Sequence, residues 1–320
     1  ISIKLMEKDG DYVLRIRDNV NMYNPFESEG DEIDSGVLKL IQKKTKYPFL
    51  LLFASIWLCF IPVFRSKDTE ETQDTKKTFA VEESKNDTTH LNEIRNIDVN
   101  GVNIVYKIQG ENQNNPVILL HGNSGEHEHL SVMINQLDSA GYLVYALDSR
   151  GQGANAPLPE YHYIDMANDL HEFIEKLHLN KPAIFGWSDG GNTALQMEVL
   201  HPNTAGAIIT AGANLFPEGV VASFWEEFKK EMLKDSIPPL TKMMLFEPQM
   251  SATDMQSIQC PALIVAGEHD LIDLAHTQLI AENIPQGEIY IVPNEDHGSF
   301  VYKSPIIGEI VLNYLKKIHY

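Results

Sequence analysis

The strongest indication of the fold is the sequence Pro182-Ala-Ile-Phe-Gly-Trp-Ser-Asp-Gly-Gly-Asn192. A short apolar run ends at Phe185, glycines stand at 186 and 190 on either side of Ser188, and a helical pattern follows. A G-x-S-x-G sequence between a strand and a helix forms a tight turn that exposes its serine. The start of the helix then favours negative charge beside the serine oxygen. The pattern predicts Ser188 as a nucleophile, and the alternative is a glycine-rich turn of a nucleotide-binding fold.

Two later loops carry a candidate base and a candidate acid. A serine hydroxyl is a weak nucleophile unless a base takes its proton, and an acid must orient that base. His297 fits the base because it follows the last apolar strand pattern and precedes the last helical pattern. Asp270 fits the acid because it directly follows the preceding strand pattern, and Glu268 and Asp273 are the alternatives.

A third loop supplies candidate hydrogen-bond donors for an oxyanion. Acyl transfer needs such donors at the oxygen that becomes negative. One is the backbone N–H of Asp189, which follows the serine, and the other is the backbone N–H of Asn123 in the sequence His121-Gly-Asn-Ser-Gly125. The alternative for the second loop is a simple glycine turn.

Short apolar runs alternate with helical patterns from residue 91 onwards. The runs are residues 116–120, 142–147, 182–185, 207–210, 262–266 and 288–292, and the helical patterns include 163–177, 192–200, 275–283 and 305–318. This alternation predicts an α/β fold with a mainly parallel sheet covered on both faces. A period-two pattern around Asn100-Gly101 predicts a hairpin, which adds antiparallel strands at one edge.

These landmarks resemble the α/β-hydrolase fold superfamily, specifically its esterase-like and lipase-like serine hydrolases. The match runs through His-Gly-Asn at 121–123, Asp-Ser-Arg-Gly-Gln-Gly at 148–153, the turn at 186–190, and the pair Asp270 and His297. Their order Ser, Asp, His is the chain order of that superfamily. The resemblance implies an eight-stranded, mostly parallel sheet flanked by helices, a triad of Ser188, His297 and Asp270, and no cofactor. It also implies a structural role for Asp148 and Arg150.

Serine at the turn favours cleavage of a carboxylic ester through an acyl-serine intermediate. Relatives with other chemistry carry Asp or Cys at this position. Thioesterase, amidase and C–C hydrolase activities and some cofactor-free peroxidases use the same triad and stay open. A non-catalytic binding member of the fold is the alternative from a different class.

An insertion with helical patterns, residues 214–259, is expected to form a small lid over the serine. It contains Met243, Met244, Phe246 and Met250, and such adaptable apolar side chains favour a small apolar substrate group. The alternative is that these residues only pack on the sheet.

The composition restricts the kinds of partner. The chain has 320 residues and a formal net charge of −20, and most of the acidic excess lies after residue 90. Nucleic-acid partners are disfavoured because phosphate binding needs clustered Lys and Arg. His127-Glu-His129 resembles the start of a binuclear zinc motif, but Leu130-Ser131 replaces the Asp-His that the motif requires. The sequence therefore predicts no metal site.

The N-terminal part lies outside the resemblance. Residues 1–46 are predicted as a polar tail, 47–64 as a transmembrane helix, 65–90 as a polar linker and 91–320 as the hydrolase domain. The uncharged run 47–64 is long enough to cross the hydrocarbon core of a bilayer and is bracketed by Lys and Arg. We expect a single-pass membrane protein with its hydrolase domain outside the cytoplasm. A buried core helix and a cleaved signal peptide are the alternatives.

Overall fold

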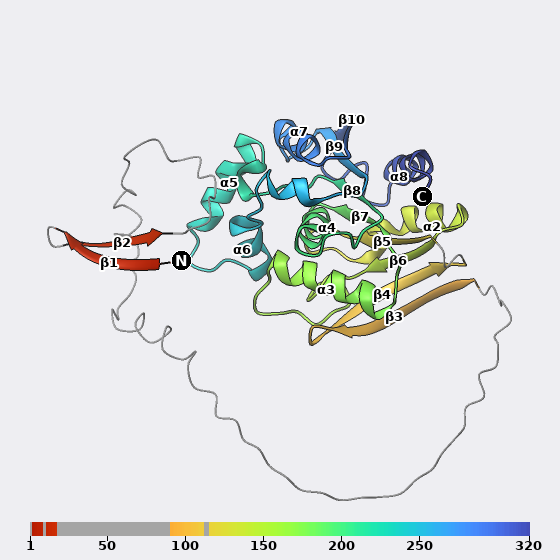
Figure 1. The fold of residues 1–320 in the computed structure, drawn as a ribbon, viewed down its shortest axis with the longest axis horizontal. Helices are drawn as coiled ribbons and strands as arrows, with labels where there is room; N and C mark the ends of the chain where they lie inside the picture. The colour runs from red at the N-terminus through yellow and green to blue at the C-terminus, as the bar shows by residue number, and fades with distance from the viewer. Residues whose placement is uncertain (1, 9–10, 18–89, 112–114) are drawn as a thin grey trace, which may run out of the picture. The chain divides into compact units, whose positions relative to one another are not determined.

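The computed structural model describes residues 2–8, 11–17, 90–111 and 115–320 (Figure 1). The chain divides into two compact units, Ile1–Glu83 and Ser84–Tyr320. Every predicted site residue belongs to the second unit, so its fold is what positions the site.

The second unit is built on an eight-stranded sheet in the order β10-β9-β8-β7-β5-β6-β4-β3. The six strands β5 to β10 run parallel to one another, and β4 pairs antiparallel with both β6 and β3. The strands are β3 (Leu91–Val99), β4 (Val102–Gly110), β5 (Pro116–Leu120), β6 (Leu143–Leu147), β7 (Ala183–Trp187), β8 (Ala207–Ala211), β9 (Ala262–His269) and β10 (Gly287–Asp296). The predicted mostly parallel, eight-stranded α/β sheet is confirmed.

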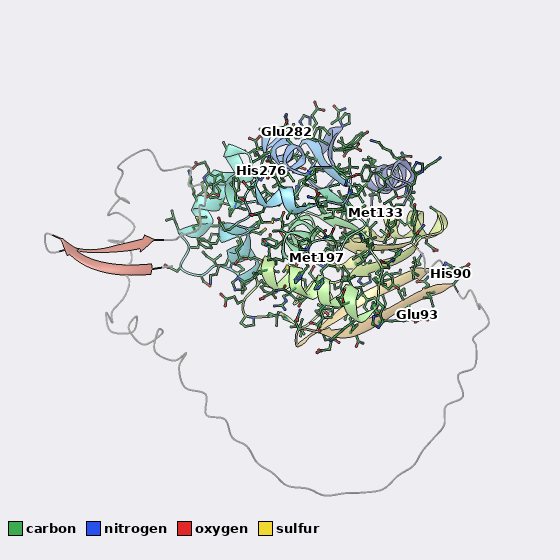
Figure 2. The ribbon with its side chains drawn as sticks, viewed as in Figure 1. His90, Glu93, Met133, Met197, His276 and Glu282 are labelled. Atoms are coloured by element: carbon green, nitrogen blue, oxygen red, sulfur yellow. The ribbon has the colours of Figure 1, made fainter. Side chains whose placement is uncertain are left out.

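Helices cover both faces of this sheet because alternate residues of each strand point to opposite sides. In β5, Val117 and Leu119 join a buried cluster with α2 and α8, whereas Ile118 and Leu120 join a second cluster with α3, α4 and α7. Met133 of α2 and Met197 of α4, labelled in Figure 2, belong to these two separate clusters. The helices are α2 (Ser131–Ser139), α3 (Tyr163–Lys176), α4 (Asp189–Leu200), α7 (Leu274–Asn283) and α8 (Pro305–Lys317). A short 3-10 turn, η2 (His127–Leu130), precedes α2.

The hairpin of β3 and β4 turns at Asn100 and Gly101. Val99 pairs with Val102, and the two turn residues have φ of 48° and 77°. Two successive positive φ angles match the twist of a two-residue hairpin, and Asn-Gly is the sequence that adopts them most readily. The predicted hairpin is therefore confirmed.

Residues 212–261, the insertion, lie between β8 and β9. The insertion contains η3 (Pro217–Gly219), α5 (Ala222–Met232), α6 (Pro239–Phe246) and η4 (Asp254–Ser257). The predicted lid, residues 214–259, falls within the insertion, and its covering role stays a prediction. Met243, Leu245 and Met250 are buried, whereas Phe246 is exposed.

The first unit contains a two-stranded antiparallel sheet in its described residues. β1 (Ser2–Lys8) pairs with β2 (Asp11–Arg17), from Ser2 with Arg17 to Lys8 with Asp11. Residues 1–46 are predicted as a polar tail, and these two strands were not predicted. The predicted linker 65–90 lies outside the described residues except for its last position.

The predicted membrane location is corrected. Within residues 2–8, 11–17, 90–111 and 115–320, no helix is long and apolar enough to cross a bilayer. α3, one of the longer helices there, has 14 residues, whereas a spanning helix needs about 20. The apolar run 47–64, on which the prediction depended, lies outside the described residues. We therefore do not retain the single-pass location or the placement of the hydrolase domain outside the cytoplasm.

Candidate active site

Ser188 stands alone between the end of β7 and the start of α4. Its φ of 52° and ψ of −115° lie in a region that side-chain-bearing residues rarely adopt. The Ser188 N–H donates to Ala211 O at 2.7 Å, and Asn192 N–H donates to Ser188 O at 3.0 Å. A Cβ at position 186 would lie 2.2 Å from Gly190 C, so only glycine lets the strand and the helix approach this closely. The sharp turn at Ser188 that the G-x-S-x-G pattern predicts is therefore present in the structure.

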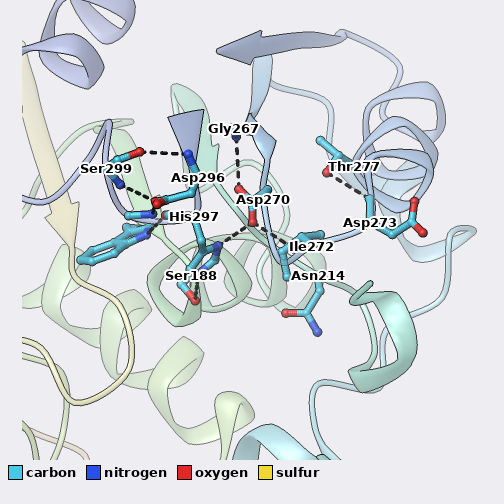
Figure 3. A network of polar contacts seen from close by, with 12 residues as sticks. Ser188, Asn214, Gly267, Asp270, Ile272, Asp273, Thr277, Asp296, His297 and Ser299 are labelled. Carbon is cyan, nitrogen blue, oxygen red and sulfur yellow. Dashed lines mark hydrogen bonds and ion pairs between the residues drawn. The ribbon is translucent and has the colours of Figure 1, made fainter. Parts of the chain in front are cut away.

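The imidazole of His297 lies between Ser188 and Asp270 (Figure 3). Its Nε2 is 3.0 Å from Ser188 Oγ, and its Nδ1 is 2.7 Å from Asp270 Oδ1. These three residues come from loops at the carboxyl ends of β7, β9 and β10. Because β9 lies between β10 and β8, and β8 pairs with β7, the parallel order brings these strand ends to one edge.

Backbone groups hold the Asp270 carboxylate. Its side chain is 0% exposed, and it accepts from Ile272 N at 2.9 Å and from Gly267 N at 3.2 Å. A buried carboxylate without partners would be costly, and these bonds satisfy it while they aim one oxygen at His297. Asp270 therefore has the surroundings of an orienting acid.

The loop that carries His297 is fixed at two points. Trp187 Nε1–H donates to His297 O at 2.9 Å. Asp296 accepts from the N–H groups of Gly298 and Ser299, each at 2.8 Å, and these bonds lower the pKa of Asp296. Figure 3 shows this turn beside the imidazole. The imidazole is thus presented by a short, internally bonded turn.

The two alternative acids have other partners. Glu268 accepts from Asn294 N at 2.8 Å, and Asp273 accepts from Ala275 N at 2.8 Å as the N-cap of α7. Of the three acidic residues that the sequence left open, the structure brings Asp270 to His297.

Asn123 and Asp189, the predicted sources of oxyanion donors, lie together at the same site. Asn123 Nδ2 donates to Asp189 Oδ2 at 2.8 Å, which ties the loop after β5 to the start of α4. The loop is also held by Ser124 N–H, which donates to Gln152 Oε1 at 2.7 Å. A Cβ at Gly122 would lie 3.4 Å from Ser188 Cβ, so this backbone passes close to the serine. Both residues line the same cavity as Ser188 and His297.

Tyr163 and Glu247 also line this cavity, and neither was predicted as a site residue. Tyr163 Oη donates to Asp189 Oδ1 at 2.6 Å, and burial raises the pKa of Tyr163 well above its usual value. Glu247 accepts from Tyr163 N at 3.1 Å and contacts His162 Nδ1 at 2.6 Å. Neither residue belongs to a recognisable motif, and only the tertiary structure brings them to the serine.

The cavity measures about 220 Å³ and is largely apolar away from the serine. Val220, Phe224, Phe228 and Met244 come from the insertion, and Leu271 and Ile272 come from the loop after β9. A cavity of this size is smaller than the roughly 300–1,000 Å³ of sites for drug-sized ligands. It suits a small apolar group beside the serine.

His127 and His129 of the sequence that resembles a zinc motif, and the nearby His121, all contact other protein groups. His127 Nδ1 is 2.8 Å from Asp148 Oδ1, and His121 Nε2 accepts from Ser149 N at 3.0 Å. His129 packs its ring against Tyr302. Among the described residues, no group of three or more His, Cys, Asp or Glu side chains is arranged to hold a metal ion.

Asp148 also accepts from Ala154 N, and Arg150 pairs with Asp169, as expected for residues that shape a turn.

Known proteins resemble the chain in sequence and in fold. A family model described as alpha/beta hydrolase fold matches residues 115–241. The chain is 27% identical over 230 residues to the Homo sapiens protein Serine hydrolase BPHL, which covers 62% of this chain and 78% of that protein. It is 22% identical over 243 residues to the AB hydrolase superfamily protein YisY of Bacillus subtilis (strain 168), covering 62% and 91%.

Solved structures share the fold. The crystal structure of the esterase RhEst1 from Rhodococcus sp. ECU1013 has a TM-score of 0.60 at 20% identity, covering 70% of this chain and 98% of that one. Together with the sheet order and the turn at Ser188, these similarities show that the chain has the alpha/beta hydrolase fold.

Proposed function

We propose that this protein is a serine hydrolase that cleaves a small carboxylic ester through an acyl-serine intermediate. The observation that carries the proposal is the continuous set of contacts from Ser188 Oγ to His297 and from His297 to Asp270, at 3.0 and 2.7 Å. Similarity to hydrolases and an esterase supports the reaction class.

In this mechanism Ser188 is the nucleophile and His297 is first a base and then an acid. Ser188 Oγ forms a bond to the carbonyl carbon while its proton moves to His297 Nε2. Asp270 orients the imidazole and stabilises its charged form. The leaving alcohol then takes the proton from His297 as the C–O bond to it breaks. A water molecule, deprotonated by His297, releases the acyl group from Ser188 by the same steps.

The backbone N–H groups of Asn123 and Asp189 are the proposed donors to the oxyanion. Their residues line the same cavity as the serine and are tied by the bond between their side chains. A single donor of this kind typically contributes about 3 kcal/mol to transition-state stabilisation. The positive end of α4 adds to the effect at the same place.

The cavity favours a short, uncharged acyl or alkyl group. Phe224, Phe228 and Met244 offer apolar surface from the insertion. Burial of such a group contributes about 25 cal/mol for each Å² of apolar surface removed from water. We therefore expect acetate and butyrate esters to be accepted ahead of long-chain esters.

The test is covalent labelling combined with turnover. A fluorophosphonate probe should label the protein at Ser188, and the label should disappear in Ser188→Ala. Ser257→Ala is the matched control, because Ser257 Oγ donates to Asp254 O in a 3-10 turn and is absent from the cavity lining. That control should label and turn over p-nitrophenyl butyrate like the unchanged protein.

Unlabelled Ser188 together with no ester turnover would contradict the proposal. Equal labelling of the Ser188→Ala variant would also contradict it. A panel of matched ester, thioester and amide substrates then ranks the acyl bonds that the site cleaves.

A further inference from the structure

We propose that Tyr163 is a positioning residue that, through the Asp189 carboxylate, fixes the two backbone N–H groups that receive the oxyanion. This inference rests on the proposed function, because it assigns a task within the same site. It concerns the side chain of Asp189, whereas the proposed mechanism uses only the backbone of that residue.

The Asp189 carboxylate receives one donor on each oxygen. Tyr163 Oη donates to Oδ1 at 2.6 Å, and Asn123 Nδ2 donates to Oδ2 at 2.8 Å. The donors come from α3 and from the loop after β5, so the carboxylate joins both to the start of α4. The two residues whose N–H groups are the proposed oxyanion donors are thus linked directly through their own side chains.

Burial makes this link rigid. Tyr163 is 1% exposed and Asp189 is 4% exposed. Burial raises the pKa of Asp189, and the bonds from Tyr163 and Asn123 oppose that shift because they stabilise the carboxylate. Hydrogen bonds to a carboxylate are short and roughly twice as strong as neutral ones. Burial keeps the Tyr163 hydroxyl protonated by raising its pKa, so it remains a donor to Asp189.

The start of α3 is itself held from the insertion. Glu247 accepts from the backbone N–H of Tyr163 at 3.1 Å. The tyrosine therefore enters the site from a fixed backbone position. Its side chain ends on the carboxylate of Asp189, and no hydrogen bond joins it to Ser188 or His297 among those of the described residues.

Position matters because oxyanion donors act only within a narrow range of distance. They stabilise the transition state when they lie about 2.7–3.1 Å from the developing oxyanion. When the supporting residues allow catalytic groups to shift by about 1 Å, much of the catalytic rate is lost. Loss of the Tyr163 bond should loosen the link between Asp189 and Asn123 without removing either N–H group.

The experiment is a double-mutant cycle of Tyr163→Phe and Asp189→Ala in the full chain. For p-nitrophenyl butyrate we expect Tyr163→Phe to lower kcat about 10-fold with KM changed less than about two-fold, and Asp189→Ala to lower kcat about 100-fold. If Tyr163 acts through Asp189, as proposed, the double variant should be no slower than Asp189→Ala.

A second readout reports the oxyanion itself. An aliphatic trifluoromethyl ketone forms a tetrahedral adduct with the serine that carries the negative oxygen. Its affinity should fall in Tyr163→Phe by the same factor as kcat/KM, as a transition-state analogue requires. Tyr142→Phe is the matched control, because Tyr142 Oη donates to Tyr320 O and is absent from the cavity lining, and it should change neither value.

Three results would overturn the inference in a protein that is active and labelled at Ser188. They are an unchanged kcat and ketone affinity in Tyr163→Phe, an effect confined to KM, and effects that multiply in the double variant. If Asp189→Ala does not unfold cooperatively on heating, Tyr163→Phe with the ketone decides the question alone. Absence of labelling and turnover in the unchanged protein would instead refute the proposed function.

Discussion

At Ser188 the backbone is held in a conformation that costs about 1–3 kcal/mol for a residue with a side chain. Two contacts hold this backbone conformation. Ser188 N–H donates to Ala211 O, and Gly186 packs closely against Gly190. The benefit of the conformation is placement, since the hydroxyl stands at the start of α4 within 3.0 Å of His297 Nε2. Strain at this residue is therefore consistent with a reactive role.

At the residue scale we predict that Asp270→Asn abolishes most of the activity while the fold survives. An asparagine keeps the shape of the side chain, but it favours the wrong imidazole tautomer and cannot balance the charged form of His297. By analogy with other triads kcat should fall about 10⁴-fold. The measurement is kcat for p-nitrophenyl butyrate.

Glu268→Gln is the matched control for that prediction. Glu268 is an exposed acid near the end of β9, two residues before Asp270, and its carboxylate accepts from Asn294 N. Its substitution should leave kcat within about two-fold, since exposed substitutions rarely perturb a distant site. A larger loss for Glu268→Gln than for Asp270→Asn would mean that the acid has been misassigned.

At the scale of elements, the insertion is tied at its first residues to two helices that flank the sheet. Asn214 N–H donates to Asn192 Oδ1 at 2.8 Å, which links the insertion to α4. Leu215 N–H donates at 2.9 Å to Nε2 of His276, a buried residue of α7 labelled in Figure 2. The insertion, which supplies apolar side chains to the cavity, is therefore held in place where it begins.

The bond between Leu215 and His276 predicts a loss of stability in mild acid. The imidazole accepts from Leu215, so it must be neutral there, and burial lowers the pKa of His276 from 6.5 to about 4. The unfolded chain binds this proton more readily, so the free energy of unfolding is largest above about pH 6.5 and falls until about pH 4. The shift corresponds to about 3 kcal/mol.

Urea unfolding of the unchanged protein and of His276→Gln checks this prediction. A glutamine oxygen can accept the same N–H bond without titrating, so the variant should lose less stability between about pH 7 and about pH 4.5. Equal losses in both proteins would show that other groups account for the acid sensitivity.

At the scale of the whole molecule, the charge predicts discrimination between substrates. The chain carries a net charge of −20, and Asp189 and Glu247 lie at the cavity itself. A field of this sign lowers the local concentration of anions. We expect kcat/KM for p-nitrophenyl succinate, which is anionic, to lie at least about 10-fold below that for the butyrate ester.

Salt provides the control for the charge prediction. Screening shortens the range of the field to about 3 Å at 1 M ionic strength, so the gap between the two esters should narrow as salt is added. A gap that is unaffected by salt would assign the preference to cavity shape instead.

Most of the sheet could be predicted from the sequence because each buried strand is a short apolar run. The run 116–120 corresponds to β5, and the Asn-Gly turn fixes the hairpin. α2 was not named, because its buried residues Met133, Ile134 and Leu137 form too short an apolar stripe to stand out. The strands of β1 and β2 were missed although Asp9-Gly10 separates their alternating apolar residues.

The candidate site was partly predictable for a related reason. Ser188, Asp270 and His297 each follow a strand pattern, and parallel topology gathers such positions at one edge. Tyr163 lies inside a helical pattern and Glu247 lies in the insertion, where no periodicity indicates which side chain meets the serine. Their contacts depend on how α3 and α6 pack, which a linear pattern does not encode.

The place of the insertion has a consequence for divergence. It leaves the sheet after β8 and returns at β9, and these two strands are parallel neighbours that pair directly, from Ile208 with Ala262 to Ala211 with Val265. Evolution can therefore lengthen, shorten or replace this excursion while the reacting groups keep their spacing. We therefore expect that exchanging this segment with that of a relative would change which substrates the cavity accepts while the reacting groups stay in place.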